Sequence, residues 1–558
     1  MATVLPSEAM EVPPIEAEMS DFARTIYEQK YAMKAENGAI LENWRDTAYR
    51  VATNVMAALG YDEDSEQTQK TFEFIRDRKF LPGGRYLYAS GRPYHQVNNC
   101  LLMRAEDSRE GWADLTQKAT MALMTGAGIG VDYSDLREED AIIKKTGGRS
   151  SGPISLMKIV NEIGRNVMQG GSRRSAIWAG LNWKHPDVFK FIHLKDWSDE
   201  VRALKEKDFN FPADMDMTNI SVILDKEFFT AYEDESHPLY HHAHRVYRTT
   251  TDRMVRTAEP GFSVDYENAR ESLRNACTEV TSEDDSDVCN LGSINLARIE
   301  SIEEMREVVE CGTLFLLAGT LYSHLPYDKV GETREKNRRL GLGLMGVHEW
   351  LLQRGYRYEP TDELGEWLDE YAKSTDYAIK YADEHGISRP IKTRAIAPTG
   401  TIGIVAETTT GIEPIFCVAY KRRYLAGGRD WKFQYVVDPT AQRLVERGVD
   451  PNKIEDAYSL SYDVERRVKF QAWIQQWVDH GISSTINLPY PIVDEEEKHQ
   501  FGDMLYDYLP KLRGITVYPD GARGGQPLSP VAYHTAITQL GVVFEENEEK
   551  CVGGVCGV

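Results

Sequence analysis

The first sixty residues carry apolar side chains at helical spacing. Ser20 is a suitable N-cap for a helix that brings Phe22, Ile26 and Tyr31 to one side. A second run of apolar residues recurs at 3.6-residue spacing before Gly60, a typical helix terminator: Leu41, Trp44, Ala48, Val51, Val55 and Leu59. The pattern predicts a small helical domain at 20–80, preceded by a flexible arm at 1–19 that is rich in Pro, Ala and Glu.

From about residue 80 the pattern changes to short β-branched or apolar runs that alternate with helical stretches. This alternation predicts an α/β fold with largely parallel strands. The clearest strand candidates are ISVIL (220–224), GSINLARI (292–299), TRAIAP (393–398), STINLP (484–489) and GITVYP (514–519). The last residues are acidic and then glycine-rich, with little to anchor them, which predicts a mobile tail at 531–558.

Composition narrows the class of protein. The chain has 558 residues with 65 Lys and Arg against 88 Asp and Glu, a net charge of −23. Binding to a nucleic-acid backbone is therefore not expected, because it needs a basic face. The N-terminus lacks the basic and apolar segments of a signal peptide, and no apolar run reaches the ~20 residues that span a bilayer. We expect a cytoplasmic protein that does not engage membranes.

Three glycine-rich segments could bind a nucleotide. Gly341, Gly343 and Gly346 in GLGLMG fit a dinucleotide fingerprint, but the charged GETREKNRR before them cannot be the buried strand that fingerprint requires. Tight helix packing is the better interpretation of GLGLMG. The APTGTIG loop (397–403) follows a short strand and could cradle phosphate oxygens or form a structural turn. The basic QGGSRRSA loop (169–176) could contact a nucleotide or face solvent.

The seven cysteines carry most of the chemical information. In NACTE (275–279), alternate residues of an extended loop tip would put Asn275, Cys277 and Glu279 on one face. Cys100 and Cys289 belong to no C-x-x-C pair and have no nearby paired histidines, so no metal site is expected.

The other cysteines fall into two groups. Cys311 and Cys417 are interpreted as buried, inert thiols. Cys551 and Cys556 form a C-x4-C pair on a glycine hinge, suited to thiol-disulfide exchange. Capture of a metal by this tail is the second interpretation.

Taken together, the motifs resemble the catalytic subunit of ribonucleotide reductase, most closely the adenosylcobalamin-dependent class II enzymes. The resemblance runs from about residue 22 to the C-terminus, in the order of the family. It rests on FLPGGR (80–85), NNC (98–100), TGAGIGVDYSDLR (125–137), SSGPISLM (150–157), QGGSRR (169–174), NACTE (275–279), CNLGSINL (289–296), RRLGLGLMG (338–346), APTGTI (397–402), STINLP (484–489), GITVYPDGAR (514–523) and the terminal C-x4-C.

The resemblance implies a ten-stranded α/β barrel at 81–530 with a central finger loop. It makes Cys277 the thiyl-radical site, with Asn275 and Glu279 on the substrate ribose and Cys100 and Cys289 as the reducing pair. The substrate phosphates are expected at the loop that contains Pro398, Thr399, Gly400 and Thr401, with Asn99, Ala127 and Gly128 near the ribose. Whether the substrate is a diphosphate or a triphosphate stays open.

The resemblance also implies regulation and partners. Asp107, Gln169, Arg173 and Arg174 are expected at an allosteric site for deoxynucleotide effectors. Cys551 and Cys556 would re-reduce the active-site pair and then be reduced by a thioredoxin- or glutaredoxin-like protein. No ATP-cone is expected, and the short stretch between Cys100 and Gln169 favours a homodimer over monomeric class II relatives.

The radical source has two candidates. Class I relatives import the radical from a metalloprotein subunit through two adjacent tyrosines, and here Tyr518 is followed by Pro519. The broken relay favours adenosylcobalamin as the cofactor, with a class I catalytic subunit as the alternative. Asn99 and Ser484 also depart from the usual family residues. A remote alternative of a different kind is a non-catalytic nucleotide- or metal-binding scaffold.

Overall fold

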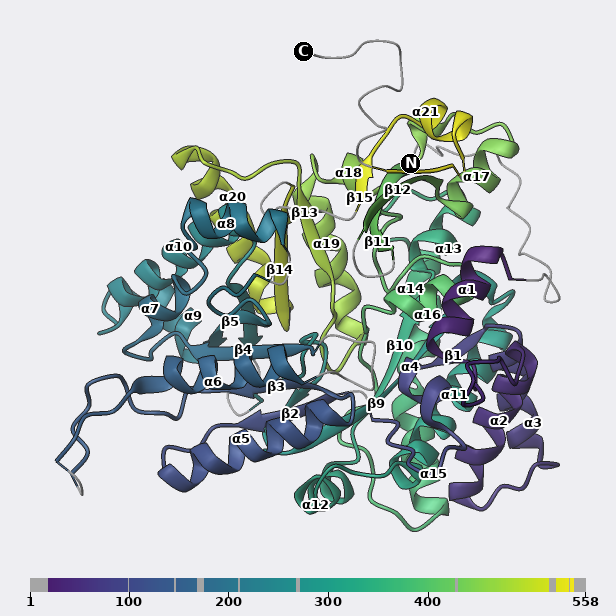
Figure 1. Ribbon diagram of the computed structural model, residues 1–558, viewed down its shortest axis with the longest axis horizontal. Helices are drawn as coiled ribbons and strands as arrows, with labels where there is room; N and C mark the ends of the chain where they lie inside the picture. The colour runs from purple at the N-terminus through teal and green to yellow at the C-terminus, as the bar shows by residue number, and fades with distance from the viewer. Residues whose placement is uncertain are drawn as a thin grey trace.

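The computed structural model describes residues 19–98, 100–144, 147–167, 175–208, 211–266, 271–426, 430–520, 528–540 and 542–545. A group of N-terminal helices lies on one side of a large α/β unit, and a four-stranded sheet is separate from the central one (Figure 1). The fold class expected from the sequence is confirmed, with a ten-stranded sheet at its centre.

The N-terminal helices are α1 (Asp21–Lys30), α2 (Trp44–Met56) and α3 (Glu66–Arg76). The first of them begins where its predicted cap, Ser20, places it, whereas Leu41 of the second predicted run lies before α2 and is exposed. The Ser20 hydroxyl accepts a hydrogen bond from the Ala23 N–H, and Gly60 ends the second helical stretch with φ +83°. The predicted buried face of α1 is partly wrong. Ala23 and Tyr27 face the core, whereas Phe22 is 45% exposed.

One half of the barrel is built of five parallel strands joined by helical crossovers. The strands are β2 (Cys100–Arg104), β3 (Gly128–Asp132), β4 (Ile177–Asn182), β5 (Thr218–Asp225) and β6 (Gly261–Asp265). The crossover helices are α5 (Arg109–Met124), α6 (Gly152–Asn166), α7 (Val188–Ile192), α8 (Asp199–Lys207), α9 (Lys226–Glu233) and α10 (Tyr240–Thr257). Such crossovers cover the outer face of the strands.

The other half is also parallel and runs through β9 (Asp287–Asn295), β10 (Leu340–Met345), the extended segment 392–396, β13 (Thr485–Leu488) and β14 (Gly514–Pro519). The 392–396 segment closes the ring, because the Ala395 N–H donates to Leu342 O at 3.1 Å and the Ile396 N–H donates to Gly481 O at 3.2 Å. The two halves meet in antiparallel pairs, β2 with β9 and β14 with β6. TRAIAP therefore acts as a strand through isolated bridges.

GLGLMG does not serve helix packing, so that interpretation is wrong. The segment is itself the strand β10, wholly buried and parallel to β9. A Cβ on Gly343 would lie 2.6 Å from the Ala395 carbonyl oxygen, so only glycine lets the 392–396 segment approach this strand. The charged stretch before it forms the separate helix α12 (Asp328–Asn337).

The remaining elements complete the outer layer. They are β1 (Phe80–Pro82), which pairs antiparallel with β9, α4 (Gly84–Ala89), α11 (Ile302–Tyr322), α13 (Val347–Gln353), α14 (Asp362–Ala372), α15 (Ser374–Glu384), α16 (Gly400–Ala406), α17 (Pro439–Glu446), α18 (Ala457–Leu460), α19 (Val464–Ile474), α20 (Glu495–Tyr508) and α21 (Tyr533–Thr538). A four-stranded antiparallel sheet joins β15 (Leu528–Pro530), β11 (Ala419–Ala426), β12 (Asp430–Val437) and β16 (Val543–Glu545).

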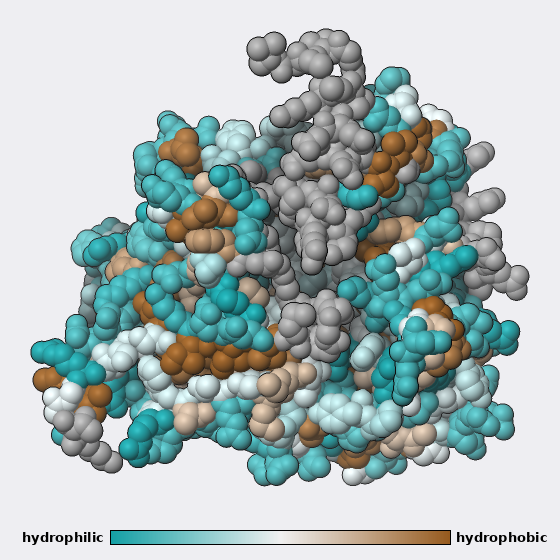
Figure 2. Space-filling model, in the orientation of Figure 1, coloured by the Kyte–Doolittle hydropathy of each residue, from teal (hydrophilic) through white to brown (hydrophobic). Residues whose placement is uncertain are grey.

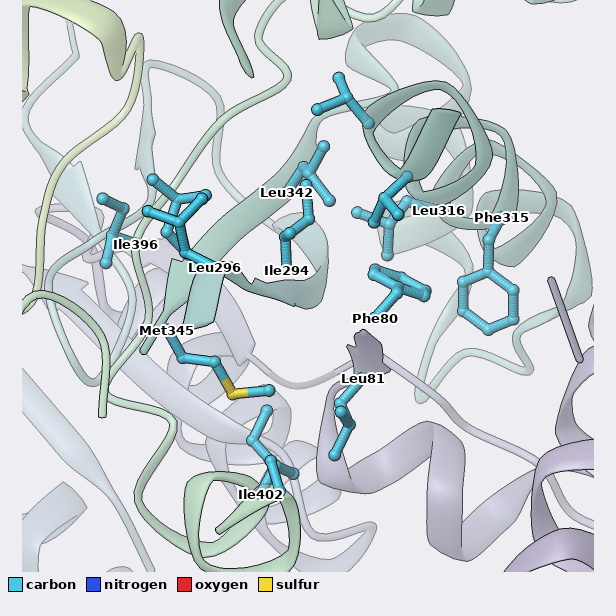
Figure 3. Close-up of a cluster of buried hydrophobic side chains, with 14 of the residues drawn as sticks. Phe80, Leu81, Ile294, Leu296, Phe315, Leu316, Leu342, Met345, Ile396 and Ile402 are labelled. Atoms are coloured by element: carbon cyan, nitrogen blue, oxygen red, sulfur yellow. The ribbon is translucent and has the colours of Figure 1, made fainter. Parts of the chain in front are cut away.

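The N-terminal helices share one hydrophobic core with the second half of the barrel. Phe80 of β1 packs edge-on against Phe315 of α11, with ring centroids 5.5 Å apart (Figure 3). The same cluster contains Leu81, Met345 and Ile402, which carries the packing to the helix α16. Within the described ranges, no helix combines the length and the apolar composition that crossing a membrane would need.

Candidate functional site

A short hairpin lies inside the barrel and carries the NACTE residues at its tip. Its strands are β7 (Leu273–Arg274) and β8 (Thr281–Ser282). Two glycines of β3 leave room for this hairpin. A Cβ on Gly130 would lie 1.9 Å from the Arg274 carbonyl oxygen, and a Cβ on Gly128 would lie 2.9 Å from the Ala276 Cβ. The alternating glycines of GAGIG thus leave the inner face of β3 bare where the hairpin passes. We call residues 275–279 the finger loop.

The finger loop is a tight turn, which differs from the extended tip predicted from the sequence. Thr278 adopts a left-handed conformation with φ +68°, and its N–H donates to the Asn275 carbonyl oxygen at 3.0 Å. The Asn275 side chain turns back on the loop, with Oδ1 accepting from the Val280 N–H at 3.0 Å. Asn275 therefore shapes the loop, while Cys277 and Glu279 line the neighbouring cavity.

The opposite wall of the barrel holds the finger loop from the other side. The Gly481 N–H donates to the Glu279 carbonyl oxygen at 2.7 Å, and the Thr281 N–H donates to His480 Nδ1 at 3.1 Å. Burial lowers the pKa of His480 well below its ordinary value, helped by nearby cationic side chains such as Lys392. A neutral imidazole is consistent with its role as an acceptor.

The cysteines that are far apart in sequence meet at the junction of the two barrel halves. Cys100 of β2 and Cys289 of β9 are directly opposed in the antiparallel register. The Cα atoms of directly opposed residues lie about 4.5 to 5.5 Å apart, within the range that a disulfide spans. Cys100 Sγ lies 3.4 Å from where a Cβ of Gly128 would be, the same glycine that contacts the finger loop. Cys100 and Cys277 therefore border one space.

That space is a cavity of about 360 Å³. Its described walls come from the finger loop, the ends of β2 and β3, the strand β9 and the segments 83–85 and 397–402, together with Tyr31 and Ala176. The lining residues include Tyr31, Arg85, Cys100, Gly128, Cys277, Glu279, Thr399 and Thr401. Cys277 is half-buried, whereas Cys100 is buried.

Glu279 is the acid of this cavity and is 1% exposed. Burial raises the pKa of Glu279 to about 7, although the Asn275 side chain and the backbone amide act in the opposite direction. Neither carboxyl oxygen has a hydrogen-bond partner among the described residues. A carboxyl group that titrates near neutrality and has unused oxygens suits proton transfer to and from a bound hydroxyl.

The 397–401 loop forms the far wall. Thr399 sits at φ +50° directly before α16, and its Oγ1 accepts from the Gly411 N–H at 2.8 Å, so its own proton remains available to donate. Pro398 and Gly400 are exposed, and Thr401 is half-buried. Of the pair expected near the ribose, Gly128 lines the cavity and Ala127 packs into the core beside it.

A buried ionic network supports the base of the finger hairpin. Arg339 donates to Glu271 at 3.1 Å and to Asp287 at 2.8 Å, and its side chain is 2% exposed. Lys392 also pairs with Glu271. Burial alone would raise the pKa of Glu271, but Lys392 and Arg339 hold it below the usual range. The network connects the hairpin to β9, two residues before Cys289.

Several predicted residues lie elsewhere or cannot be placed. Asp107 follows β2 on an exposed loop and pairs with Arg137 at 2.8 Å, and it is not among the cavity residues. Cys311 and Cys417 are buried, and burial raises the pKa of each thiol to about 12. Outside the described residues lie Asn99, Gln169, Arg173, Arg174, Cys551 and Cys556. In the part of the chain that is described, no group of three His, Cys, Asp or Glu is arranged to hold a metal.

Among the lining residues that sequence reasoning missed, Tyr31 and Arg85 carry the largest polar side chains. Tyr31 belongs to the N-terminal helical part, and its hydroxyl lies 2.9 Å from where a Cβ of Gly84 would be. The FLPGGR motif contained a signal for both, since its glycines permit this close approach and its arginine follows directly.

Comparisons with known proteins agree with this geometry. The family described as "Ribonucleotide reductase, all-alpha domain" matches residues 17–95, and "Ribonucleotide reductase, barrel domain" matches 98–272, 241–382 and 376–518. A vitamin B12-dependent ribonucleoside-diphosphate reductase of Mycobacterium tuberculosis is 26% identical over 97% of this chain and 84% of its own length. The Thermoplasma acidophilum protein of the same name is 26% identical over 90% of this chain and 71% of its own.

Two further similarities bear on substrate and fold. A protein of Mycobacterium phage D29, provisionally named an adenosylcobalamin-dependent ribonucleoside-triphosphate reductase, is 28% identical over 81% of this chain and 75% of its own length. The crystal structure of a B12-dependent class II ribonucleotide reductase superposes with a TM-score of 0.69 and 16% identity, covering 92% of this chain and 93% of that one. At this identity the superposition supports the fold.

Proposed function

The chain belongs to the ribonucleotide reductase family, and from this premise we propose that it reduces ribonucleotides to 2′-deoxyribonucleotides with adenosylcobalamin as its radical source. The observation that carries the proposal is the convergence of Cys277, Cys100 and Glu279 on one cavity, with Cys289 directly opposite Cys100. These groups are contributed by three separate segments of the chain.

The residues divide the chemistry among them. Cys277, as a thiyl radical, takes the hydrogen from C3′ of the ribose, and Glu279 accepts the proton of the 3′-hydroxyl. The 2′-hydroxyl leaves as water. The thiols of Cys100 and Cys289 supply two electrons and two protons and become a disulfide, so one ribonucleotide and two thiols give one deoxyribonucleotide, one disulfide and water. At the end the Cys277 thiol returns the hydrogen atom to C3′ and is a thiyl radical again.

Cys277 also suits the proposed cofactor. It is half-buried on the cavity wall, so a group brought to the cavity can reach its sulfur. Tyr518 of β14 is followed by the buried Pro519, so the second ring of a tyrosine relay is missing. When bound, adenosylcobalamin supplies the radical chemistry that side chains cannot start alone. Cys277 is the residue that would exchange hydrogen with it.

The proposal assigns the substrate phosphates to Pro398, Thr399, Gly400 and Thr401. The support is the start of α16, where Gly400 is exposed and the first backbone N–H groups lack helical partners, together with the Thr399 hydroxyl. We further propose that Asp107 and the 169–174 loop bind deoxynucleotide effectors. In the same scheme, Cys551 and Cys556 pass electrons from a thioredoxin- or glutaredoxin-like partner, and the protein works in the cytoplasm.

We also propose that the chain forms a homodimer, with the contact on the first half of the barrel. The outer surface of α5 and α6 carries a groove lined by the apolar side chains of Ile159, Ile163 and Val167 together with Thr120, Lys158, Glu162 and Asn166, and Figure 2 shows a brown patch along α6. Ile159 is 44% exposed. Since contiguous apolar surface on a soluble chain marks an association site, we assign this surface to a second copy of the chain.

The decisive test is an assay without any second subunit. Purified protein with adenosylcobalamin, a dithiol and CDP or CTP should form the deoxynucleotide, and Cys277→Ser should form none. Cys417→Ser is the matched control and should keep its activity, because that thiol lies outside the cavity. Activity that is absent with the cofactor and appears only with a metalloprotein partner would favour the class I alternative.

A further inference from the structure

Arg85 is the last residue of FLPGGR, a motif that the cysteine chemistry leaves without a role. It follows β1 and lies in the first turn of α4. Its side chain lines the same cavity as Cys100, Cys277 and Thr399. A charged residue at this position has to be explained, since the rest of the cavity wall is built mainly of glycine, alanine and small polar residues.

The charge balance of the cavity singles out Arg85. Among the described lining residues, Glu279 is the only carboxyl group and Arg85 is the only cation. A ribonucleotide brings at least two negative charges on its phosphates, and Glu279 adds to the negative charge whenever it is ionised. Arginine stays protonated at every physiological pH, and its planar fork of N–H donors matches two phosphate oxygens.

The position of the guanidinium is fixed by its neighbours. Nη2 donates to the Gln96 carbonyl oxygen at 3.1 Å. Nη1 lies over Gly126, where a Cβ would be only 2.6 Å away and φ is +89°. Gly126 is two residues before Gly128, which borders both Cys100 and the finger loop. A side chain held in this way is preorganised, which lowers the entropy lost when a ligand binds.

The segment that carries Arg85 also packs on the helix after the 397–401 loop. Leu81 and Ile402 belong to one buried cluster and approach each other around Met345 (Figure 3). Arg78, close before this segment, pairs with Glu407 at 2.7 Å, directly after α16. Arg85 therefore belongs to the stretch of wall that connects the cysteine strands to the proposed phosphate loop.

We propose that Arg85 is a substrate-binding residue that contacts the phosphate groups of the nucleotide. The inference rests on the proposed function and deepens it, because it gives the cavity a positive group for a polyphosphate. The neutral 398–401 loop would supply backbone donors, and Arg85 would supply the charge. A nucleoside without phosphates would gain no affinity from Arg85 and would bind more weakly than the nucleotide.

Binding and turnover of Arg85→Gln and Arg85→Lys test this inference. Equilibrium binding is measured for cytidine, CDP and CTP. In the wild type, CDP and CTP should bind more tightly than cytidine. Arg85→Gln should weaken CDP and CTP by about 10- to 100-fold and leave cytidine unchanged, as expected for loss of a charged hydrogen bond. The affinity of Arg85→Lys for CDP and CTP should lie between those of the wild type and Arg85→Gln, because lysine keeps the charge and loses the planar fork of donors.

Kinetics separate a binding role from a structural one. In Arg85→Gln the KM should rise by the same factor as the Kd for CDP, with a much smaller change in kcat. The matched control is Arg92→Gln, since Arg92 stacks on Tyr88 at 4.2 Å near the same helix and is not among the cavity residues. This control should leave every affinity unchanged.

The outcomes distinguish this inference from the proposed function. Reductase activity with an unchanged KM and unchanged CDP affinity in Arg85→Gln overturns the role of Arg85 and leaves the function standing. Loss of CDP affinity in a protein that has no reductase activity under any condition overturns the function and supports the phosphate contact. If circular dichroism shows that Arg85→Gln is unfolded, Arg85→Lys decides: equal affinity of Arg85→Lys and the wild type for CDP overturns the inference.

Discussion

At the scale of single residues, Glu279 couples activity to stability. Burial raises its pKa from 4.5 to about 7. Between these values the folded chain holds a proton that the unfolded chain has lost. The free energy of unfolding therefore falls as the pH rises from about 4.5 to about 7. Above pH 7 the buried carboxylate leaves the folded chain less stable than it is near pH 4.5. The same shift keeps the group ready to accept a proton near neutrality.

We predict that Glu279→Gln lowers turnover at least about 100-fold and stabilises the fold at pH 8 by roughly 2 to 3 kcal/mol. The neutral amide removes the buried charge and cannot take the 3′ proton. Urea unfolding at pH 5 and pH 8 measures the free energy of unfolding, and the pH dependence of turnover reports the pKa of the base. The exposed Glu235→Gln is the control. Equal stability of Glu279→Gln and wild type at pH 8 would contradict the role of burial.

Gly130 shows how one missing side chain makes room for the finger hairpin. A Cβ at this position would lie 1.9 Å from the Arg274 carbonyl oxygen, a backbone atom that cannot turn aside. We expect Gly130→Ala to displace the hairpin and to abolish turnover, with a loss of stability of about 2 to 4 kcal/mol. Limited proteolysis and thermal unfolding would detect the displacement.

The control for this substitution is Gly365→Ala in α14, where the added Cβ meets its nearest neighbour at 3.8 Å, an ordinary contact. Alanine should be neutral there or stabilise the helix by about 0.5 to 1 kcal/mol. If Gly130→Ala behaved like Gly365→Ala in both stability and turnover, close approach of the hairpin to β3 would not be a requirement of the site.

At the scale of elements, Arg339 ties the finger hairpin to the strand that carries Cys289. It bridges Glu271 and Asp287, and all three side chains are 10% exposed or less. Removing the guanidinium would leave two carboxylates in a buried setting, and among the described residues Lys392 forms an ion pair with Glu271 but not with Asp287. Breaking such a network from one side costs much more than an exposed ion pair contributes.

We therefore predict that Arg339→Met destabilises the protein by about 3 to 5 kcal/mol in urea unfolding. The exposed pair of Arg389 and Asp383, at 2.8 Å, offers the comparison. Arg389→Met should change the free energy of unfolding by less than about 1 kcal/mol. A similar small effect for both variants would mean that water reaches the Arg339 network and screens it.

The elements also show which features the sequence can predict. Helix starts at Ser20 and strands such as GITVYP depend on local residues, so they were predictable. The strand role of GLGLMG was not, because it depends on the Ala395 backbone lying against Gly343. The finger-loop turn was also hidden, since Thr278 adopts φ +68° without a glycine to signal it. Long-range contacts decide both cases.

At the scale of the whole molecule, the opposition of Cys100 and Cys289 depends on barrel closure. Cys100 and Cys289 are 189 residues apart and come together only where the two parallel halves meet. The family resemblance implied that they would be neighbours, but their opposition in register is a property of the assembled barrel. Tyr31 shows the same principle, because a residue of the helical part completes the wall of a cavity in the barrel.

The groove over α5 and α6 leads to a prediction about assembly. Ile159 lines this groove and is 44% exposed, and burying it against a second copy would favour association through removal of apolar surface from water. We predict that the wild type is a dimer by light scattering and that Ile159→Glu is a monomer with an unchanged far-UV spectrum. A charge placed in a dry apolar contact costs several kcal/mol unless it is paired. Val493 is 71% exposed in a loop, so Val493→Glu is the matched control and should stay dimeric. A monomeric wild type, or a dimer that survives Ile159→Glu, would place the contact elsewhere.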